Sequence, residues 1–207
     1  MYRGLSEFSY QLIPSVGRLF GKEPFMTKEK LFHFERSAFN EFRIGVYSEL
    51  RENDQFILLA VAQHHGLRTR LLDWTFSPLI ALFFAVENNK KYNCDGAFWA
   101  FQTQFDFNDF QNISSPFDES LNDYHFIFSP SLSPRIKAQQ GIFQLFKYPT
   151  REFKEASNLN KYKIPCDKKR PILRDLADLG ITYNTLFPDF DGLCKSINYV
   201  KLKSHDE

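Results

Sequence analysis

The sequence predicts a mixed α+β domain in which short strands and helices follow one another irregularly. Strand-like apolar stretches and capped helical stretches alternate without a regular β-α-β repeat, which is typical of this class. The chain has 207 residues, of which 43% are hydrophobic and 24 are phenylalanine. This is enough to build one substantial domain whose core is filled largely by aromatic rings.

Six short stretches that are rich in apolar or aromatic residues and bounded by turn residues are expected to be strands. They are Tyr2–Gly4, Thr69–Trp74, Ala97–Phe101, His125–Phe128, Ile142–Phe146 and Lys161–Pro165. Gln11–Ser15 should be a further short extended piece that ends through Pro14. Residues 103–124 show no period and should form a long irregular insertion.

Start and stop signals predict five helices. They run from the Thr27 cap to about Ile44, over Gln55–His65 with Asn53 or Asp54 as the cap and Gly66 as the stop, from Ser77-Pro78 to Val86, from Pro171 to Gly180, and onward from about Pro188. The third is apolar on nearly every face and should be central and buried. Glu35 is expected on the solvated side of the first helix, and Leu193, Ile197 and Val200 on the packed side of the last. The domain should cover residues 1–202, with a frayed tail at 203–207.

Charge and composition exclude several classes of protein. A net charge of +1 provides no global field for binding nucleic acid or membrane. Cys94, Cys166 and Cys194 lie far apart, so no disulfide framework or zinc spacing results and a cytoplasmic location is expected. His64 and His65 point in different directions on a helix, so no metal site is expected there. The apolar runs are too short to cross a bilayer, and the N-terminus lacks a signal peptide.

The most unusual stretch is residues 63–86, in which polar and apolar residues are packed together. Arg70, Asp73 and Trp74 precede the helix start at Ser77. An amide-rich helix start beside an arginine and a tryptophan is where an anionic, planar ligand is expected. The alternative is structural: Arg70 and Asp73 pair with each other or cap neighbouring helices, and Trp74 lies in the core.

Motifs along most of the chain resemble the FRG domain family, which is named for an N-terminal Phe-Arg-Gly. They are Tyr2-Arg3-Gly4; Leu12–Ser15 with Arg18; Gln63–Gly66; Thr69–Thr75 with Ser77-Pro78, Ala81-Leu82 and Phe84-Ala85; Asp95-Gly96; Arg135-Ile136 with Gln139, Gly141 and Phe143; and Leu186–Asp189 with Asp191–Leu193. The resemblance extends from Tyr2 to about Leu193. Its most specific part is the central block, residues 63–86. Tyr2 stands where the family has Phe, and Arg68 where it tends to have proline.

The layout of the FRG family is similar to that of ADP-ribosyltransferases. This implies one α+β domain with a split, mixed or antiparallel sheet and surrounding helices. Arg3 matches the arginine on the first core strand of those enzymes, and Thr75 and Ser77 resemble the polar end of a later strand. Gln139-Gln140-Gly141 stands where they have Gln-x-Glu or Glu-x-Glu, so Gly141 occupies the glutamate position and Asp73 is the best alternative carboxylate.

The resemblance implies NAD as a substrate, for ADP-ribosyl transfer to a protein or nucleic-acid acceptor or for NAD cleavage. Arg3, Gln139 and Asp73 are the implied catalytic residues, with Gln139 facing the site and Gln140 turned toward solvent. The implied nucleotide-binding residues are Tyr2, Arg3, Gly4, His64, Arg70, Trp74, Thr75, Ser77, Arg135 and Gln140.

Two other interpretations stay open. The first is a non-catalytic module that binds a nucleotide, a nucleic acid or a protein, which the missing glutamate favours. The second treats Arg70-Asp73 and Arg135-Gln139 as a buried polar network that specifies the fold alone. The family's usual bacterial and phage setting suggests a role in conflict between phage and host.

Overall fold

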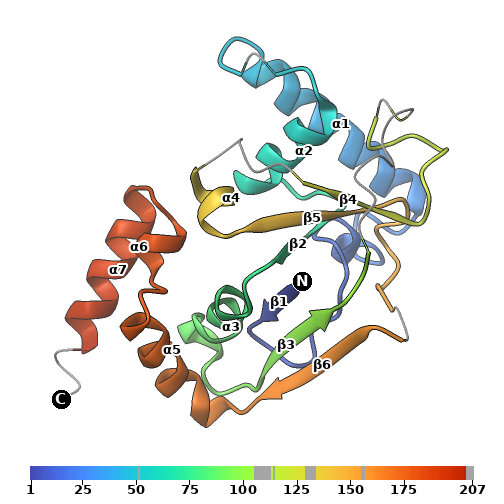
Figure 1. Ribbon diagram of the computed structural model, residues 1–207. Coiled ribbons are helices and arrows are strands. Elements are labelled where there is room, and N and C mark those ends of the chain that lie inside the picture. The colour runs from blue at the N-terminus through green and yellow to red at the C-terminus, as the bar shows by residue number, and fades with distance from the viewer. Residues whose placement is uncertain (51, 105–112, 114, 129–133, 155–156, 204–207) are drawn as a thin grey trace.

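The computed structural model describes residues 1–50, 52–104, 113, 115–128, 134–154 and 157–203, and its centre is a six-stranded sheet (Figure 1). The strands are β1 (Tyr2–Leu5), β2 (Leu71–Thr75), β3 (Gly96–Phe101), β4 (Tyr124–Ile127), β5 (Gly141–Phe146) and β6 (Leu159–Ile164). They lie in the order β4-β5-β2-β1-β3-β6, and every neighbouring pair is antiparallel. The predicted α+β class is confirmed, and the sheet is antiparallel rather than mixed.

Helices surround this sheet. The described helices are α1 (Lys28–Val46), α2 (Gln55–His64), α3 (Pro78–Val86), α4 (Pro134–Ala138), α5 (Lys169–Asp178), α6 (Tyr183–Leu186) and α7 (Phe190–Lys203), with 3-10 turns η1 (Gly17–Leu19), η2 (Asn89–Lys91) and η3 (Cys166–Lys168). Thr27, Asp54 and Ser77 cap the first three through their side chains, as predicted. Gly66 follows α2 with a φ of +94°, which glycine adopts at low cost.

The two central strands, β1 and β2, separate almost at once. They share the single register pair Tyr2–Thr75, whereas β1 pairs with β3 over four residues and β2 with β5 over five. The half-sheets β4-β5-β2 and β1-β3-β6 therefore diverge beyond that pair. Arg3 extends toward β2 where they part, because its Nη1 donates a hydrogen bond to the backbone oxygen of Asp73.

Helix α3 lies directly on β1. A Cβ atom at Gly4 would stand 1.8 Å from the backbone oxygen of Ala81, so this contact requires glycine. Gly4, one of the implied nucleotide-binding residues, thus lies against the backbone of α3. At the other end of β1, the fully buried Lys169 donates to the oxygens of Ser6 (2.6 Å) and Lys91 (2.7 Å), which fastens the start of α5.

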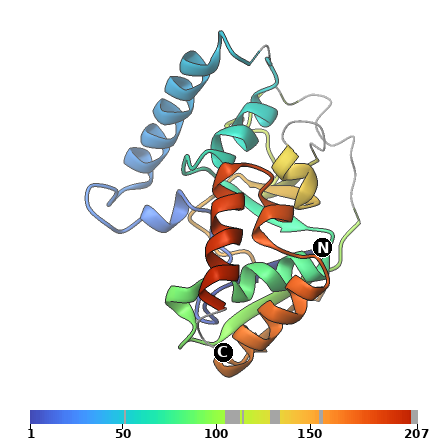
Figure 2. The same ribbon diagram turned by 90° about the vertical axis from the view of Figure 1, so that its left-hand side faces the viewer.

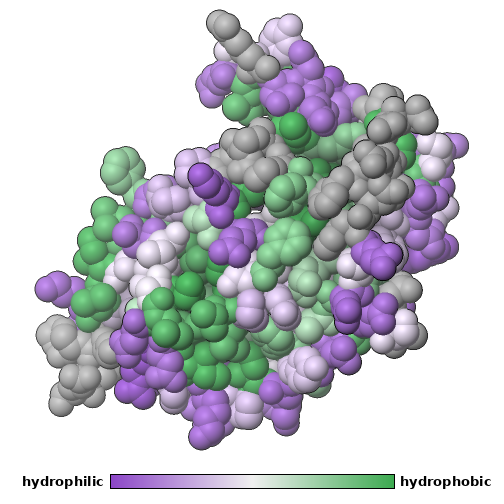
Figure 3. Space-filling model, in the orientation of Figure 1, coloured by the Kyte–Doolittle hydropathy of each residue, from purple (hydrophilic) through white to green (hydrophobic). Residues whose placement is uncertain are grey.

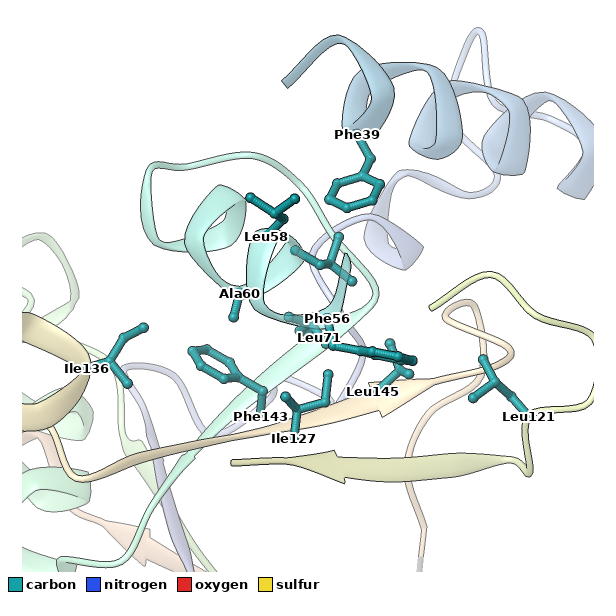
Figure 4. Packing of buried hydrophobic residues seen from close by; sticks show 11 residues of the cluster. Phe39, Phe56, Leu58, Ala60, Leu71, Leu121, Ile127, Ile136, Phe143 and Leu145 are labelled. Atoms are coloured by element: carbon teal, nitrogen blue, oxygen red, sulfur yellow. The ribbon is translucent and has the colours of Figure 1, made fainter. Parts of the chain in front are cut away.

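Apolar side chains form three clusters around the sheet. Figure 4 shows the first, in which Phe39 of α1 and Phe56, Leu58 and Ala60 of α2 cover Leu71, Phe143, Leu145 and Ile127 of the strands. The second contains Trp74, Trp99, Phe101, Phe146 and Phe153, and the third joins α3, α5 and α6 through Phe83, Leu173, Leu176 and Leu186. Aromatic rings are prominent in each cluster, as the phenylalanine content predicts.

The Arg70–Asp73 pair considered above does not form, and the solvated position expected for Glu35 is wrong. Glu35 is 1% exposed and accepts hydrogen bonds from Arg70 Nη2 (2.7 Å) and Nε (3.0 Å). Arg70 also donates to the Pro116 oxygen and stacks on Phe117, with 4.5 Å to the ring centroid. This buried pair joins α1 to the start of β2, and Glu35 turns inward because it lies between Leu31 and Phe39 on the buried face of α1.

The packing expected for α7 is also wrong. Leu193, Ile197 and Val200 are 42%, 49% and 59% exposed, and Phe190 is 85% exposed. Apolar side chains are visible along this helix in Figure 3, and Figure 2 shows α7 at the outer surface of the helices that end the chain. α7 instead packs through Gly192, where a Cβ atom would lie 1.9 Å from the Phe187 oxygen.

Other expectations have mixed outcomes. β2 begins at Leu71 rather than Thr69, and α5 begins at Lys169, two residues before Pro171. The expected insertion lies partly outside the described residues, as do residues 204–207 of the expected tail. Among the helices that the described residues form, none has the length and apolar character needed to cross a bilayer.

Candidate functional site

The exposed carboxylate of Asp73 is the centre of the site. It lies on β2, where β1 separates from that strand. Its Oδ1 accepts a hydrogen bond from Gln63 Nε2, and its Oδ2 lies 3.6 Å from Arg3 Nη1. The Asp73 side chain is 57% exposed, while that of Arg3 is 13% exposed. A mostly buried arginine therefore holds a carboxylate that remains open to a ligand.

A short hydrogen-bond chain orients Gln63 toward this carboxylate. Thr69 Oγ1 donates to Gln63 Oε1 and accepts from the Leu71 backbone N–H (3.2 Å). With its oxygen engaged, the amide of Gln63 presents its NH2 group to Asp73. Sequence reasoning missed Gln63 and Thr69 as site residues. Gln63 lies in the Gln-His-His-Gly motif, and this motif is the sequence feature that could have indicated its role in the site.

Arg3 has hydrogen-bonding capacity that the protein does not use. Of its donors, Nη1 meets an acceptor among the described residues, whereas the buried Nε has none. Burial lowers the pKa of Arg3, the Asp73 carboxylate opposes this, and the positive charge of Arg18 adds to it. Arg18 thus lies close enough to repel Arg3, although it was not among the predicted site residues.

Thr75 and Ser77 support the junction between strand and helix. The Thr75 hydroxyl donates to the Gln139 backbone oxygen (2.8 Å) and accepts from the Ser77 N–H (3.1 Å). Ser77 Oγ in turn accepts from the Ile80 N–H at 3.4 Å. Both hydroxyl groups therefore hold the backbone that enters α3. Tyr2 lies beside them because it pairs with Thr75 across β1 and β2. The centroid of its ring is 5.7 Å from that of Phe98.

The segment before β5 reaches this junction mainly through its backbone. Gln139 Nε2 donates to the Leu186 oxygen (3.2 Å), so its amide contacts α6. Gln140 is exposed, as predicted, and has a φ of +47°, while its oxygen accepts from the Phe76 N–H (3.1 Å). Gln139 therefore touches Thr75 through its main chain, and its side chain points to the C-terminal helices.

Gly141, where the resemblance to ADP-ribosyltransferases would lead one to expect a glutamate, has room for a Cβ atom. A Cβ atom there would meet its nearest neighbour, the Ile136 oxygen, at 3.6 Å, which is ordinary contact. Gly141 is directly paired with Thr75, and Asp73 with Phe143 two residues further along β5. Directly paired residues point to the same face of a sheet, so a side chain at position 141 would share the face of Asp73.

His64 and Arg135 lie on the α2 and α4 side of Asp73. Burial, and then the positive charges of Arg135 and His65, lower the pKa of His64, which favours its neutral imidazole. Burial also lowers the pKa of Arg135, while the carboxylates of Asp189 and Asp73 oppose this. The guanidinium of Arg135 lies 4.2 Å from the ring centroid of Phe187. The Leu186–Leu193 motif is thereby brought to the site.

Two predicted binding residues lie inside the protein. Trp74 is 2% exposed and its indole N–H donates to Gln144 Oε1 (2.9 Å), so it is a core residue. Arg70 is 5% exposed and is fully engaged with Glu35. Trp74 thus has the core position that the structural alternative gives it, whereas Arg70 is buried through Glu35 and not through a pair with Asp73. Neither side chain reaches the surface at Asp73. Within the described part of the chain, no group of three or more His, Cys, Asp or Glu side chains could hold a metal ion.

The FRG domain model matches residues 1–94. The matched range contains Arg3, Arg18, Gln63 and Asp73, whereas α4, β5 and α6 lie beyond it. No curated protein and no solved structure gives a significant match.

Proposed function

We propose that this domain binds NAD and breaks its nicotinamide–ribose bond beside the Asp73 carboxylate, so that nicotinamide leaves and the ADP-ribosyl group passes to a protein or nucleic-acid acceptor or to water. The observation that carries the proposal is the exposed Asp73 carboxylate, held between Arg3 and Gln63 where β1 and β2 diverge. Cleavage of the nicotinamide bond builds positive charge on the ribose, and a fixed carboxylate stabilises that charge. An arginine beside it suits the phosphates of the same substrate.

We further propose that the sheet is of the ADP-ribosyltransferase type. Three features support this assignment. An aromatic-Arg-Gly sequence forms the central strand β1, Thr75 and Ser77 end β2 before α3, and Gln139 and Gly141 enter β5 beside them. In this arrangement Asp73 on β2 takes the role of the glutamate that Gly141 replaces.

A binding module without turnover is the second candidate. Gly141 has no carboxylate, and the amide of Gln139 is directed to Leu186 instead of Asp73. On this account, Arg3 and Asp73 recognise a nucleotide that is not cleaved. A protein acceptor, a nucleic-acid acceptor and a role in conflict between phage and host belong to the first candidate alone.

The test is incubation with NAD labelled in nicotinamide or in adenine, alone and with protein, DNA or RNA. The proposal predicts nicotinamide release by the wild-type chain. Gly141→Glu should raise the rate, because a Cβ atom at this position makes only ordinary contacts and the added side chain would face the side of Asp73. Gly141→Gln is the matched control, with the same size and no charge. Binding of NAD without release, by wild type and Gly141→Glu alike, would favour the module.

A further inference from the structure

Arg18 is held near Asp73 by a segment that is hydrogen-bonded to the strand entry. Ser15 Oγ accepts from the Thr69 N–H (3.1 Å), and the Val16 N–H donates to the Thr69 oxygen (3.2 Å). A Cβ atom at Gly17 would stand 1.8 Å from the Pro149 oxygen, so this turn packs closely against the chain. The 3-10 turn that carries Arg18 is therefore fixed relative to β2.

The guanidinium of Arg18 is oriented but largely unused. Its Nε donates to the Ile13 oxygen (2.8 Å), which anchors the group by one edge. The two terminal nitrogens meet no acceptor among the described residues, and Arg18 is exposed. Partial burial of the guanidinium lowers the pKa of Arg18, while the negative charge of Asp73 opposes this. Arg18 thus presents two free donor groups on the side of the site that faces solvent.

The charges around Asp73 do not balance. The negative charge of Asp73 acts on both Arg3 and Arg18, and the positive charge of Arg68 repels Arg18. The unused donors are Nε of Arg3 and the terminal nitrogens of Arg18. Excess positive charge with several free N–H groups favours an anion with many oxygens, and arginine forks match phosphate oxygens in particular.

We propose that Arg18, together with Arg3, binds the diphosphate group of a nucleotide ligand. The inference rests on the proposed function and deepens it by assigning the phosphates to a residue outside the predicted site. The negative charge of Asp73 stabilises both charged guanidinium groups in the free protein. The diphosphate supplies the negative charge that Asp73 alone does not, and the ribose beyond it remains near the carboxylate.

The test measures binding of ADP-ribose, inorganic pyrophosphate and adenosine by calorimetry. Arg18→Ala should weaken binding of ADP-ribose and pyrophosphate by about tenfold to a hundredfold, the usual loss of a charge-assisted contact. Adenosine binding should not change. Arg18→Lys keeps the charge without the fork and should give a smaller loss. Arg36→Ala removes the same charge from an exposed position on α1 and should behave as wild type.

Several outcomes would overturn the inference. They are wild-type affinity for ADP-ribose in Arg18→Ala, an equal loss for adenosine, and a wild-type chain that binds neither phosphate probe. The proposed function fails separately. If ADP-ribose binding depends on Arg18 but no nicotinamide is ever released, the diphosphate site stands and catalysis does not. If NAD is cleaved with an unchanged KM in Arg18→Ala, catalysis stands and the diphosphate site does not.

Discussion

Two arginine–carboxylate pairs flank β2, and they are built in opposite ways. Arg70 and Glu35 make two hydrogen bonds of 2.7 and 3.0 Å, and their side chains are 6% and 1% exposed. Arg3 and Asp73 lie 3.6 Å apart, and the carboxylate is 57% exposed. The first pair is closed, with aromatic rings around the guanidinium, whereas the second leaves donors and a carboxylate open.

The closed pair, Arg70 and Glu35, stabilises the fold, whereas the open pair, Arg3 and Asp73, is arranged to bind a ligand. A buried ion pair is stable when both partners are fully hydrogen-bonded, and removing one partner leaves an uncompensated charge. In the open pair the exposed carboxylate of Asp73 is screened by water, so its attraction to the mostly buried Arg3 contributes less to stability. The exposed member, Asp73, can therefore be altered at a smaller cost to folding than either member of the closed pair.

The largest expected effect comes from breaking the closed pair. Glu35→Ala leaves Arg70 buried without its carboxylate and should lower the free energy of unfolding by about 3–5 kcal/mol. Chemical denaturation measures this loss. Glu41→Ala, at an exposed position of the same helix, is the control and should change stability by less than about 0.5 kcal/mol. Equal stability of the two variants would mean that the closed pair does not hold α1 on the sheet.

Breaking the open pair from the arginine side should affect binding. Arg3→Ala removes the charge that faces Asp73 and should weaken NAD or ADP-ribose binding by about 1–3 kcal/mol. Titration calorimetry on the folded variant gives this value. Unchanged nucleotide affinity would show that Arg3 belongs to the fold, as Arg70 does.

The two glutamines before β5 should differ mainly in stability. Gln139→Ala loses the hydrogen bond to the Leu186 oxygen and should cost about 1 kcal/mol of unfolding free energy. Gln140→Ala changes an exposed side chain that makes no hydrogen bond to the described residues. It should change neither stability nor nucleotide binding noticeably. Thermal melts and NAD titrations of both variants check this. A loss of NAD affinity in Gln140→Ala would place Gln140 in the site instead.

Sequence reasoning succeeded where the signal is local. The caps at Thr27, Asp54 and Ser77, and the stop at Gly66, act within one turn of their own helix, so they can be read directly. α4 was missed because a five-residue helix leaves too short a periodic pattern. For α7, the spacing shows an apolar face but cannot show whether another element covers it.

The site was harder to predict because its partners are distant in sequence. Arg70 finds Glu35 across 35 residues, and Arg3 finds Asp73 across 70. No pattern in the central block indicates which arginine reaches which carboxylate. The family resemblance supplied Arg3, but Arg18 emerges from the turn fastened to Thr69, and Gln63 from the orientation of its amide.

The most direct test of the open pair is nicotinamide release by Asp73→Asn. Asparagine keeps an oxygen for Gln63 but carries no charge, so the unfolding free energy should change by less than about 1 kcal/mol. If Asp73 is the carboxylate that stabilises the ribosyl cation, the release rate per folded molecule should fall by about a hundredfold or more. A wild-type rate in folded Asp73→Asn would contradict the central claim, as would a loss of stability like that of Glu35→Ala with release intact.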